Sequence, residues 1–410
     1  MEFIDNIKKK DYEDFMKTAS YTHFMQSYDF GKIKKTKHYI PHYVGLKENN
    51  KIVCMAMLLE KKLIKNYTYF YVPRGFIIDY QNKELLKEFT KYLKEYCKKN
   101  HALYLRIDPA IKRFTQDING KKIDGEDNLE LINYLKELGY HHKGFKLGFS
   151  DNEQPRFTFR IDIDKPIEDV YKKFHATTRK VLNKGNQYNL EIYKGNVNDI
   201  KDFYITMEET SKREGIMQAP IDYYQKFYEI FNKDNMSDLY IAKVNIQKLQ
   251  TQLNNEIKEL QNKECKNDVK IKENENKIRK IKKLLNELND ITEEELTLAS
   301  IITVKYQDKV WTVHGGNNSK LMSLNANYLV YYEIIKDACK DGYKIVDLFG
   351  ASGEANPNSS NPIYGIHSFK KRLGGEYTEF IGEFDLITNK FIYHLFNFLN
   401  NIRHKIKRKK

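Results

Sequence analysis

Cysteine and long apolar runs are both scarce in this chain of 410 residues. The longest clean apolar stretch, residues 52–59, is far below the ~18 residues that a membrane-spanning helix needs, and charged residues occupy the N-terminus where a signal peptide would be apolar. The four cysteines are Cys54, Cys97, Cys265 and Cys339. They lie far apart without CxxC spacing, so the sequence predicts neither a disulfide framework nor a metal site. We therefore expect a reduced, cytoplasmic protein that neither crosses a membrane nor is exported.

Aromatic residues, glycine and proline are absent between Asn245 and Asp290, although the chain contains 23 Phe, 30 Tyr and 1 Trp. Leu and Ile recur in this segment at a and d spacing in two runs, separated by a polar break at residues 265–268. Two helices of about twenty residues, rising about 1.5 Å per residue, would form an antiparallel hairpin about 30 Å long. The composition thus predicts a coiled-coil arm over residues 245–295.

Basic residues outnumber acidic ones, 70 against 56, which gives a formal net charge of +14. Such a balance favours anionic partners such as nucleic acid or acidic membrane surfaces, although coding bias also produces Lys-rich chains. Residues 403–410 contribute six of the positive charges, and the arm contributes a net three. This basic tail would contact nucleic acid or the anionic inner leaflet of the membrane, or else form a disordered solubilising segment.

Two groups of basic side chains are candidates for contacts with RNA phosphates. Arg179, Lys180 and Lys184 follow two threonines on a predicted helix. Lys280 and Lys283 belong to a crowd of basic residues on the second helix of the arm. In both places a solvated helix face is the alternative interpretation.

The rest of the chain contains the same order of signals twice, with an offset of about 241 residues. In the first stretch two strands, a helix and a further strand are predicted at residues 53–59, 67–72, 83–99 and 102–107. In the second they are predicted at residues 298–304, 309–313, 325–340 and 344–348. This order indicates an α+β protein with two similar halves and mixed sheets, and it is compatible with the fold of N-acetyltransferases. The [QR]xxGx[GA] loop that usually holds coenzyme A is not present, which disfavours acetyl-CoA as donor.

Several segments, in order along nearly the whole chain, resemble the Fem family of non-ribosomal peptidoglycan aminoacyltransferases. They are residues 22–27 (THFMQS), 69–75 (YFYVPRG), 103–109 (LYLRIDP), 178–180 (TRK), 349–353 (FGASG), 369–371 (FKK) and 377–383. The arm also lies where FemA-like members carry a coiled-coil insertion. The resemblance implies two tandem N-acetyltransferase-like (GNAT) subdomains, at residues 1–150 and at residues 151–244 with 296–395, followed by a basic tail at residues 396–410.

The same resemblance implies an activity. Family members move an amino acid from aminoacyl-tRNA to the stem-peptide amine of lipid II or of its UDP-MurNAc-pentapeptide precursor. The implied partners are therefore aminoacyl-tRNA, that acceptor, and peripherally the inner membrane surface, with no cofactor and no metal. Two alternatives remain open: a non-catalytic tRNA- or RNA-binding protein, and an N-acyltransferase that uses acyl-CoA.

Substrate-binding residues carry over from the family one at a time. Lys34 matches a lysine that contacts the phosphates of the acceptor, with Lys32 as a nearby competitor, and Tyr223 matches a tyrosine of the acceptor site. Three positions depart from the family pattern: Ala219 replaces an arginine, and Thr312 and His314 replace two tyrosines of the pocket. The remaining matches are Arg74, Phe369 and Glu383.

Lys370 and Asp108 are the two candidate catalytic residues. Aminolysis of an aminoacyl ester needs a neutral amine, a stabilised oxyanion and a protonated leaving hydroxyl. Lys370 would be a fixed cation near the carbonyl oxygen or the tRNA terminus, whereas a solvated basic turn is the alternative. Asp108 would accept the proton of the amine or orient it; a salt bridge to Arg106 or a turn cap is the alternative. Glu383 is expected to hold the acceptor or a backbone amide.

Overall fold

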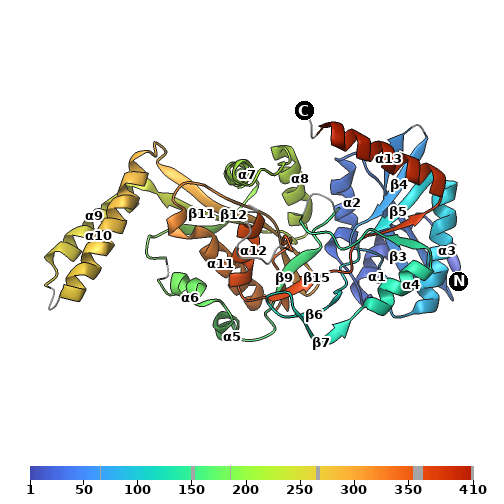
Figure 1. Cartoon of the computed structure of the whole chain (residues 1–410), viewed down its shortest axis with the longest axis horizontal. Helices are drawn as coiled ribbons and strands as arrows, with labels where there is room; N and C mark the ends of the chain where they lie inside the picture. Colours follow the sequence, from blue (N-terminus) through green and yellow to red (C-terminus); the bar gives the residue numbers. More distant parts are fainter. Residues whose placement is uncertain (65, 149–152, 185, 265–267, 354–362, 408–410) are drawn as a thin grey trace. The chain divides into compact units, whose positions relative to one another are not determined.

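The computed structural model describes residues 1–64, 66–148, 153–184, 186–264, 268–353 and 363–407. The chain divides into two compact units, each with its own sheet (Figure 1). Unit 1 consists of Met1–Arg160, Phe349–Lys371 and Gly375–Lys410, and unit 2 consists of Ile161–Leu348 and Arg372–Gly374.

A seven-stranded sheet forms the centre of unit 1, with strand order β1-β2-β3-β4-β5-β16-β8. The strands are β1 (Glu2–Ile4), β2 (Ile40–Glu48), β3 (Lys51–Ile64), β4 (Tyr67–Val72), β5 (Ala102–Ile107), β16 (Phe384–Ile387) and β8 (Tyr140–His142). β4 and β5 are parallel, and every other neighbouring pair is antiparallel. A parallel pair requires a crossover connection, which in this unit is a helix.

Helix α3 (Lys83–Lys99) makes this crossover from β4 to β5. The side chain of Asn82 accepts a hydrogen bond from the backbone N–H of Leu85 at 3.0 Å and so caps the first turn. The apolar face of α3 is buried in one core with β2, β3, β4 and β5. The other elements of unit 1 are α1 (Lys9–Thr18), η1 (Phe24–Gln26), α2 (Tyr28–Lys35), β6 (Phe114–Gln116), β7 (Lys122–Asp127), α4 (Leu129–Glu137), β9 (Phe157–Asp162), α12 (Ile363–Arg372), β15 (Glu376–Glu379) and α13 (Lys390–Lys407).

Unit 2 contains a run of five neighbouring strands in the order β10-β11-β12-β13-β14. They are β10 (Glu191–Gly195), β11 (Leu239–Asn245), β12 (Glu295–Tyr306), β13 (Lys309–Asn317) and β14 (Ile345–Asp347). Helix α11 (Ala326–Lys340) makes the crossover from β13 to β14. The other elements of unit 2 are α5 (Ile167–Lys172), α6 (Ala176–Asn183), η2 (Val197–Asp199), α7 (Ile200–Glu214), α8 (Ile221–Asn232) and η3 (Met322–Leu324).

The internal repeat predicted from the sequence is confirmed by strand pairing. Strands β1 to β5 and strands β10 to β14 each form three antiparallel pairs followed by one parallel pair. Two α-helices stand between the first two strands of each series, and one α-helix crosses over before the last. The fold is therefore α+β with two tandem halves of one topology, as predicted.

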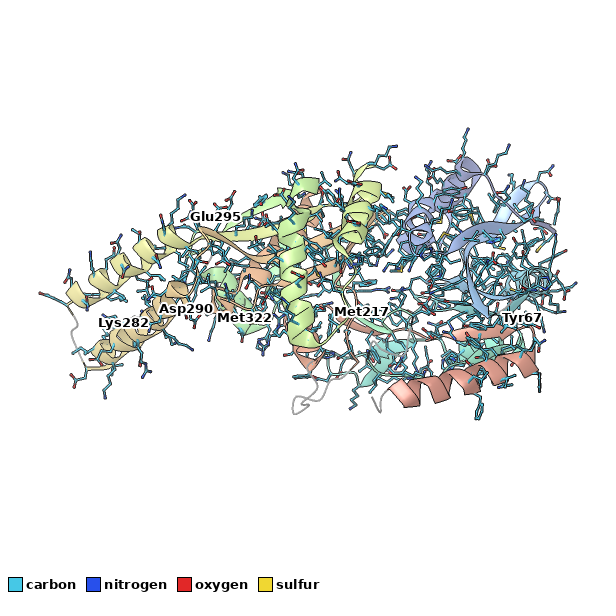
Figure 2. All side chains as sticks on the ribbon, turned by 90° about the horizontal axis from the view of Figure 1, so that it is seen from above. Tyr67, Met217, Lys282, Asp290, Glu295 and Met322 are labelled. Atoms are coloured by element: carbon cyan, nitrogen blue, oxygen red, sulfur yellow. The ribbon has the colours of Figure 1, made fainter. Side chains whose placement is uncertain are left out.

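Helices α9 (Ile246–Asn262) and α10 (Asp268–Asn289) connect β11 to β12 of unit 2. They lie side by side in both views, and Lys282, Asp290 and Glu295 mark the returning chain in Figure 2. Their buried residues are Ile246, Leu249, Leu253 and Ile257 on α9 and Ile281, Leu284 and Leu288 on α10. A helical hairpin thus occupies the predicted segment, whereas coiled-coil packing stays a prediction. The predicted break falls mostly on residues 265–267, which lie outside the described residues.

The units of the structure have different bounds from the predicted subdomains. Phe349–Lys371 and residues 375–395 were expected in the second subdomain but belong to unit 1, where β16 pairs with both β5 and β8. The predicted start of the basic tail at residue 396 falls inside α13. Residues 408–410 of that tail lie outside the described part of the chain.

Candidate functional site

Asp108 directly follows β5 and lies beside the tight turn that follows β4. The residue is only 4% exposed. The carboxylate accepts a hydrogen bond from the backbone N–H of Arg74 at 2.6 Å and one from the hydroxyl of Tyr71 at 3.1 Å. Burial raises the pKa of Asp108 to about 7, with the charge of Arg74 opposing the shift and the carboxylate of Glu383 adding to it. The side chain thus changes charge near neutral pH. Its expected alternative, a salt bridge to Arg106, is wrong because Arg106 pairs with another carboxylate.

Arg74 is held in a left-handed backbone conformation with φ of 61°, which is uncommon for a residue other than glycine. The Tyr21 hydroxyl donates a hydrogen bond to the Arg74 carbonyl at 2.5 Å, and Asp108 holds the N–H of the same residue. The buried guanidinium donates to the Pro155 carbonyl at 3.1 Å and lies over the ring of Phe380 at 5.0 Å. Surroundings that fix an unusual backbone in this way are typical of functional sites.

Lys370 lies on α12 with 8% of its surface exposed, so the expected alternative of a solvated basic turn is wrong. Its ammonium donates hydrogen bonds to the carbonyl of Phe349 and, at 2.7 Å, to that of Gly350. Both carbonyls belong to the turn after β14, where Phe349 and Gly350 have φ of 45° and 58°. The guanidinium of Arg74 lies 5.9 Å from the ring of Phe349, so Asp108, Arg74 and Lys370 are linked through neighbouring groups of unit 1.

A buried network of charges borders this cluster. Glu383 accepts a hydrogen bond from the backbone N–H of Glu153, as expected for a carboxylate that holds an amide, and burial raises its pKa. Arg106 donates to both carboxylate oxygens of Asp385, at 2.7 and 2.9 Å, and lies 3.5 Å from Glu153. Asp385 also accepts a hydrogen bond from the hydroxyl of Tyr393 at 2.6 Å. Despite its complete burial, these bonds keep the pKa of Asp385 below its usual value.

Lys34 is half-buried at the end of α2, with its ammonium 5.1 Å from the ring centre of Phe30 and 5.6 Å from that of Tyr39. Burial lowers the pKa of Lys34 to about 8, and the charge of Lys37 lowers it further. The carboxylates of Glu153 and Asp108 raise the pKa of Lys34, so their charges act on the Lys34 ammonium. Lys32, the competitor, is exposed and paired with Asp29 at 2.6 Å.

Unit 2 brings together two other predicted residues, Tyr223 on α8 and His314 on β13. Their ring centres are 5.8 Å apart, and His314 also packs against Tyr224 and Phe227 at 5.2 and 4.9 Å. Thr312, two residues before His314 on β13, is buried. Phe369, beside Lys370 on α12, is half-buried in unit 1.

The predicted tRNA-binding residues have differing surroundings. Arg179 donates a hydrogen bond to the carbonyl of Lys172 at 2.7 Å, which occupies part of its guanidinium. Lys180 and Lys184 are exposed and line a cavity of about 200 Å³ at the start of α11. Lys280 and Lys283 are exposed on α10.

The FemAB family model matches residues 7–401 of this chain. The chain belongs to the FemAB family. The lipid II:glycine glycyltransferase of Staphylococcus epidermidis is 28% identical over 404 residues, covering 95% of this chain and 94% of that protein. A protein of the same name from Staphylococcus aureus is 25% identical over 409 residues, with the same coverage. The crystal structure of FemX matches with a TM-score of 0.76 and 25% identity, covering 96% of this chain and 99% of FemX.

These matches confirm the family resemblance, the fold class and, at the level of enzyme class, a transferase. The roles of the individual residues in this FemAB chain stay predictions. Within the described ranges, no group of three or more His, Cys, Asp or Glu side chains could hold a metal ion. Likewise, no described helix is both long and apolar enough to cross a membrane.

Four residues that support this FemAB site were not singled out from the sequence: Tyr21, Tyr71, Asp385 and Tyr393. Tyr71 and Arg74 belong to the same YFYVPRG segment, in which Tyr71 stands in the strand and Arg74 in the turn that follows it. Asp385 faces Arg106 across antiparallel strands, 279 residues away in sequence. No local signal could have paired these two residues.

Proposed function

We propose that this FemAB protein transfers an amino acid from aminoacyl-tRNA to the stem-peptide amine of a peptidoglycan precursor and so builds the interpeptide bridge. The observation that carries the proposal is similarity to lipid II:glycine glycyltransferases over 95% of this chain and 94% of theirs. The acceptor is lipid II or UDP-MurNAc-pentapeptide. The names of the relatives make glycine the first amino acid to test.

The reaction needs few catalytic groups because the ester is already activated. The amine nitrogen attacks the ester carbonyl carbon, and the bond from that carbon to the ribose oxygen then breaks. The amine loses one proton and the ribose oxygen gains one, so the step is balanced without a cofactor. Placing two large anionic substrates in contact supplies about 7 kcal/mol or more of the barrier reduction.

Lys370 supplies positive charge for the oxyanion in this proposal. Its ammonium is fixed by the carbonyls of Phe349 and Gly350, so it does not have to reorganise as negative charge develops. An ammonium in a site with little water acts more strongly on a nearby oxyanion than one in solution.

Asp108 accepts the proton of the attacking amine, or fixes the amine by a hydrogen bond. A carboxylate with a pKa of about 7 is a better general base at neutral pH than one with an ordinary value, because proton transfer to it is less uphill. Its bonds from Arg74 and Tyr71 hold the carboxylate in one orientation.

The acceptor is bound through its phosphates by Lys34, and Arg74 belongs to the same substrate-binding group, with Glu383 fixing the backbone at Glu153. Phe369, Tyr223, Thr312 and His314 line the places where the amino acid and the stem peptide are recognised. The tRNA is held by basic groups of unit 2 and its arm. They are Arg179, Lys180, Lys184, Lys280 and Lys283.

The working location that we propose is the cytoplasm at the inner membrane surface. A lipid-linked acceptor places the reaction there, whereas a UDP-linked acceptor does not require it. Soluble aminoacyl-tRNA is the donor in both cases.

The decisive experiment incubates the full chain with charged tRNA and either lipid II or UDP-MurNAc-pentapeptide, and then weighs the acceptor. A gain of one amino-acid residue mass supports the proposal, and separate reactions with glycyl-, alanyl- and seryl-tRNA identify the donor. Retained tRNA binding with an unchanged acceptor would mean a binding protein instead. Activity with acyl-CoA alone would mean a coenzyme A-dependent transferase.

A further inference from the structure

Helix α13 carries four large apolar side chains on its solvent side. Phe391 is 79% exposed, Leu395 47%, Phe398 61% and Leu399 51%. They stand at i, i+4, i+7 and i+8, so they form one stripe along the helix. We call these four residues the α13 stripe. Figures 1 and 2 both show α13, in red, at the border of unit 1.

The opposite side of α13 is the one attached to unit 1. Tyr393 follows Phe391 by two residues, which turns it by roughly 200° around the helix. It is buried, donates its hydroxyl to Asp385 at 2.6 Å, and packs against Tyr104 with ring centres 5.4 Å apart. The α13 stripe is therefore not the core-facing side of a surface helix. A contiguous exposed apolar stripe of this kind marks an interaction surface.

The sequence on either side of the stripe is basic: Lys390 precedes it, and the other Lys and Arg follow from residue 403. Residues 386–410 contain seven Lys and Arg and no Asp or Glu. An apolar helix face with cations and no acids is the composition of helices that lie in the plane of an anionic bilayer. A second copy of this chain is a poorer occupant, because the basic residues that flank one stripe would find no acidic partner in residues 386–410 of the other copy.

We propose that α13 docks on an anionic membrane surface, with the α13 stripe entering the boundary between head groups and acyl chains. This deepens the proposed function, because it names the surface that would bring a lipid-linked acceptor to unit 1. The inner side of α13 reaches the candidate site through Tyr393, Asp385 and Arg106, which lies 3.5 Å from Glu153. Docking would therefore hold the acceptor-binding end of unit 1 next to the bilayer.

The test is sedimentation of the full-length protein with phosphatidylglycerol–phosphatidylcholine vesicles, with neither tRNA nor acceptor present. We expect binding that weakens as salt is raised, and that falls by about tenfold or more in the double variant Phe391→Ser with Phe398→Ser. Met322→Ser is the matched control, because Met322 is an equally exposed apolar residue of unit 2 and should leave binding unchanged. Because no substrate is present, a missing transferase activity would not affect this result.

Three outcomes would overturn the docking proposal. They are no vesicle binding by the unaltered chain at low salt, equal binding to pure phosphatidylcholine, and undiminished binding by the double variant. Sedimentation velocity without vesicles addresses the other occupant: a dimer that the double variant abolishes would assign the stripe to a second copy. Thermal unfolding at an unchanged temperature, together with transfer to the soluble UDP-linked acceptor, shows that the double variant is folded.

Discussion

Lys370 is a buried cation with a defined position, and its charge can be tested separately from its packing. Replacing it with methionine keeps much of the side-chain volume but removes the ammonium that holds Phe349 and Gly350. We expect the single-turnover transfer rate of Lys370→Met to fall at least about tenfold, which corresponds to about 1.4 kcal/mol of transition-state stabilisation.

Lys371→Met is the matched control. Lys371 is the next residue on α12, but its ammonium bonds to the exposed side chain of Asn119 at 2.7 Å. Its rate should stay within about twofold of the unaltered protein. Lys370→Arg restores a cation and should recover part of the rate. A near-normal rate in Lys370→Met would remove Lys370 from the catalytic residues.

Asp108 should give the reaction a pH dependence that its amide cannot reproduce. The folded-state pKa is raised to about 7 by burial, so the carboxylate is mostly protonated below that pH and mostly ionised above it. If Asp108 is the base, the single-turnover rate rises with pH and levels off above about 7. Asp108→Asn should lower the plateau by about a hundredfold and lose this limb of the profile.

The free energy of unfolding provides a second test of the raised pKa of Asp108. The folded state prefers the protonated carboxyl, whereas the unfolded state loses the proton near pH 4, so the free energy of unfolding should fall as pH rises from about 4 to about 7 and then level off. Asp108→Asn lacks this loss, which chemical denaturation at several pH values between about 4 and 8 can measure. Should the variant lose acceptor binding yet keep its single-turnover rate, Asp108 would be a positioning residue.

Lys34 should bind acceptor phosphates more weakly as it loses its proton. Its pKa is lowered to about 8, so raising the pH through that value removes the charge before an ordinary lysine would lose it. Calorimetric affinity for UDP-MurNAc-pentapeptide should therefore fall above about pH 8, and Lys34→Met should weaken binding about tenfold at neutral pH. Lys32→Met is the control because Lys32 is exposed and already paired with Asp29. Equal losses in the two variants would contradict a special role for Lys34.

At the scale of elements, the two helices of the arm should act mainly through charge. Ile281, Leu284 and Leu288 are buried against α9, which leaves Lys280 and Lys283 on the solvent side. If they contact tRNA phosphates, the pair of changes Lys280→Glu and Lys283→Glu should weaken tRNA affinity about tenfold and reduce its salt dependence by about two ionic contacts.

The control for this pair of changes is an exposed lysine outside the arm. Lys87 on α3 of unit 1 is suitable because it is exposed and its ammonium lies 3.9 Å from the carboxylate of Glu84. Lys87→Glu should leave filter-binding affinity for tRNA nearly unchanged. Deleting residues 247–290 provides the stronger test, since unchanged affinity after that deletion would exclude the arm from tRNA binding.

Local periodicity was sufficient to predict the elements but not their long-range pairing. The face of α3 and the composition of the arm are properties of neighbouring residues, so both were predictable. The position of β16 between β5 and β8 was not, because that pairing joins residues more than 240 apart. In the site, family motifs led to Asp108, Arg74 and Lys370. The left-handed backbone at Arg74 and the role of Tyr21 depend on packing that no short motif encodes.

At the scale of the whole molecule, unit 1 is assembled from both ends of the chain, whereas nearly all of unit 2 is one continuous segment. A chain truncated after Gly374 keeps every residue of unit 2 but loses β15, β16 and α13 from unit 1. The truncation also removes Asp385, the carboxylate that accepts two hydrogen bonds from the guanidinium of Arg106. Glu153, at 3.5 Å, is then the remaining carboxylate partner of this partly buried guanidinium, and the loss of β16 leaves β5 and β8 without a shared neighbour.

We therefore expect the truncated chain to unfold selectively. Hydrogen exchange measured by mass spectrometry should show β5 and α3 losing protection by at least about a hundredfold, while β12 and α11 keep theirs. Asp385→Asn in the full chain is a smaller change, since it retains β16 and removes only the charge opposite Arg106. This variant should lower hydrogen-exchange protection in unit 1 alone. Uniform loss of protection across both units would mean that they unfold as one cooperative structure, and full protection of β5 would show that unit 1 does not need the end of the chain.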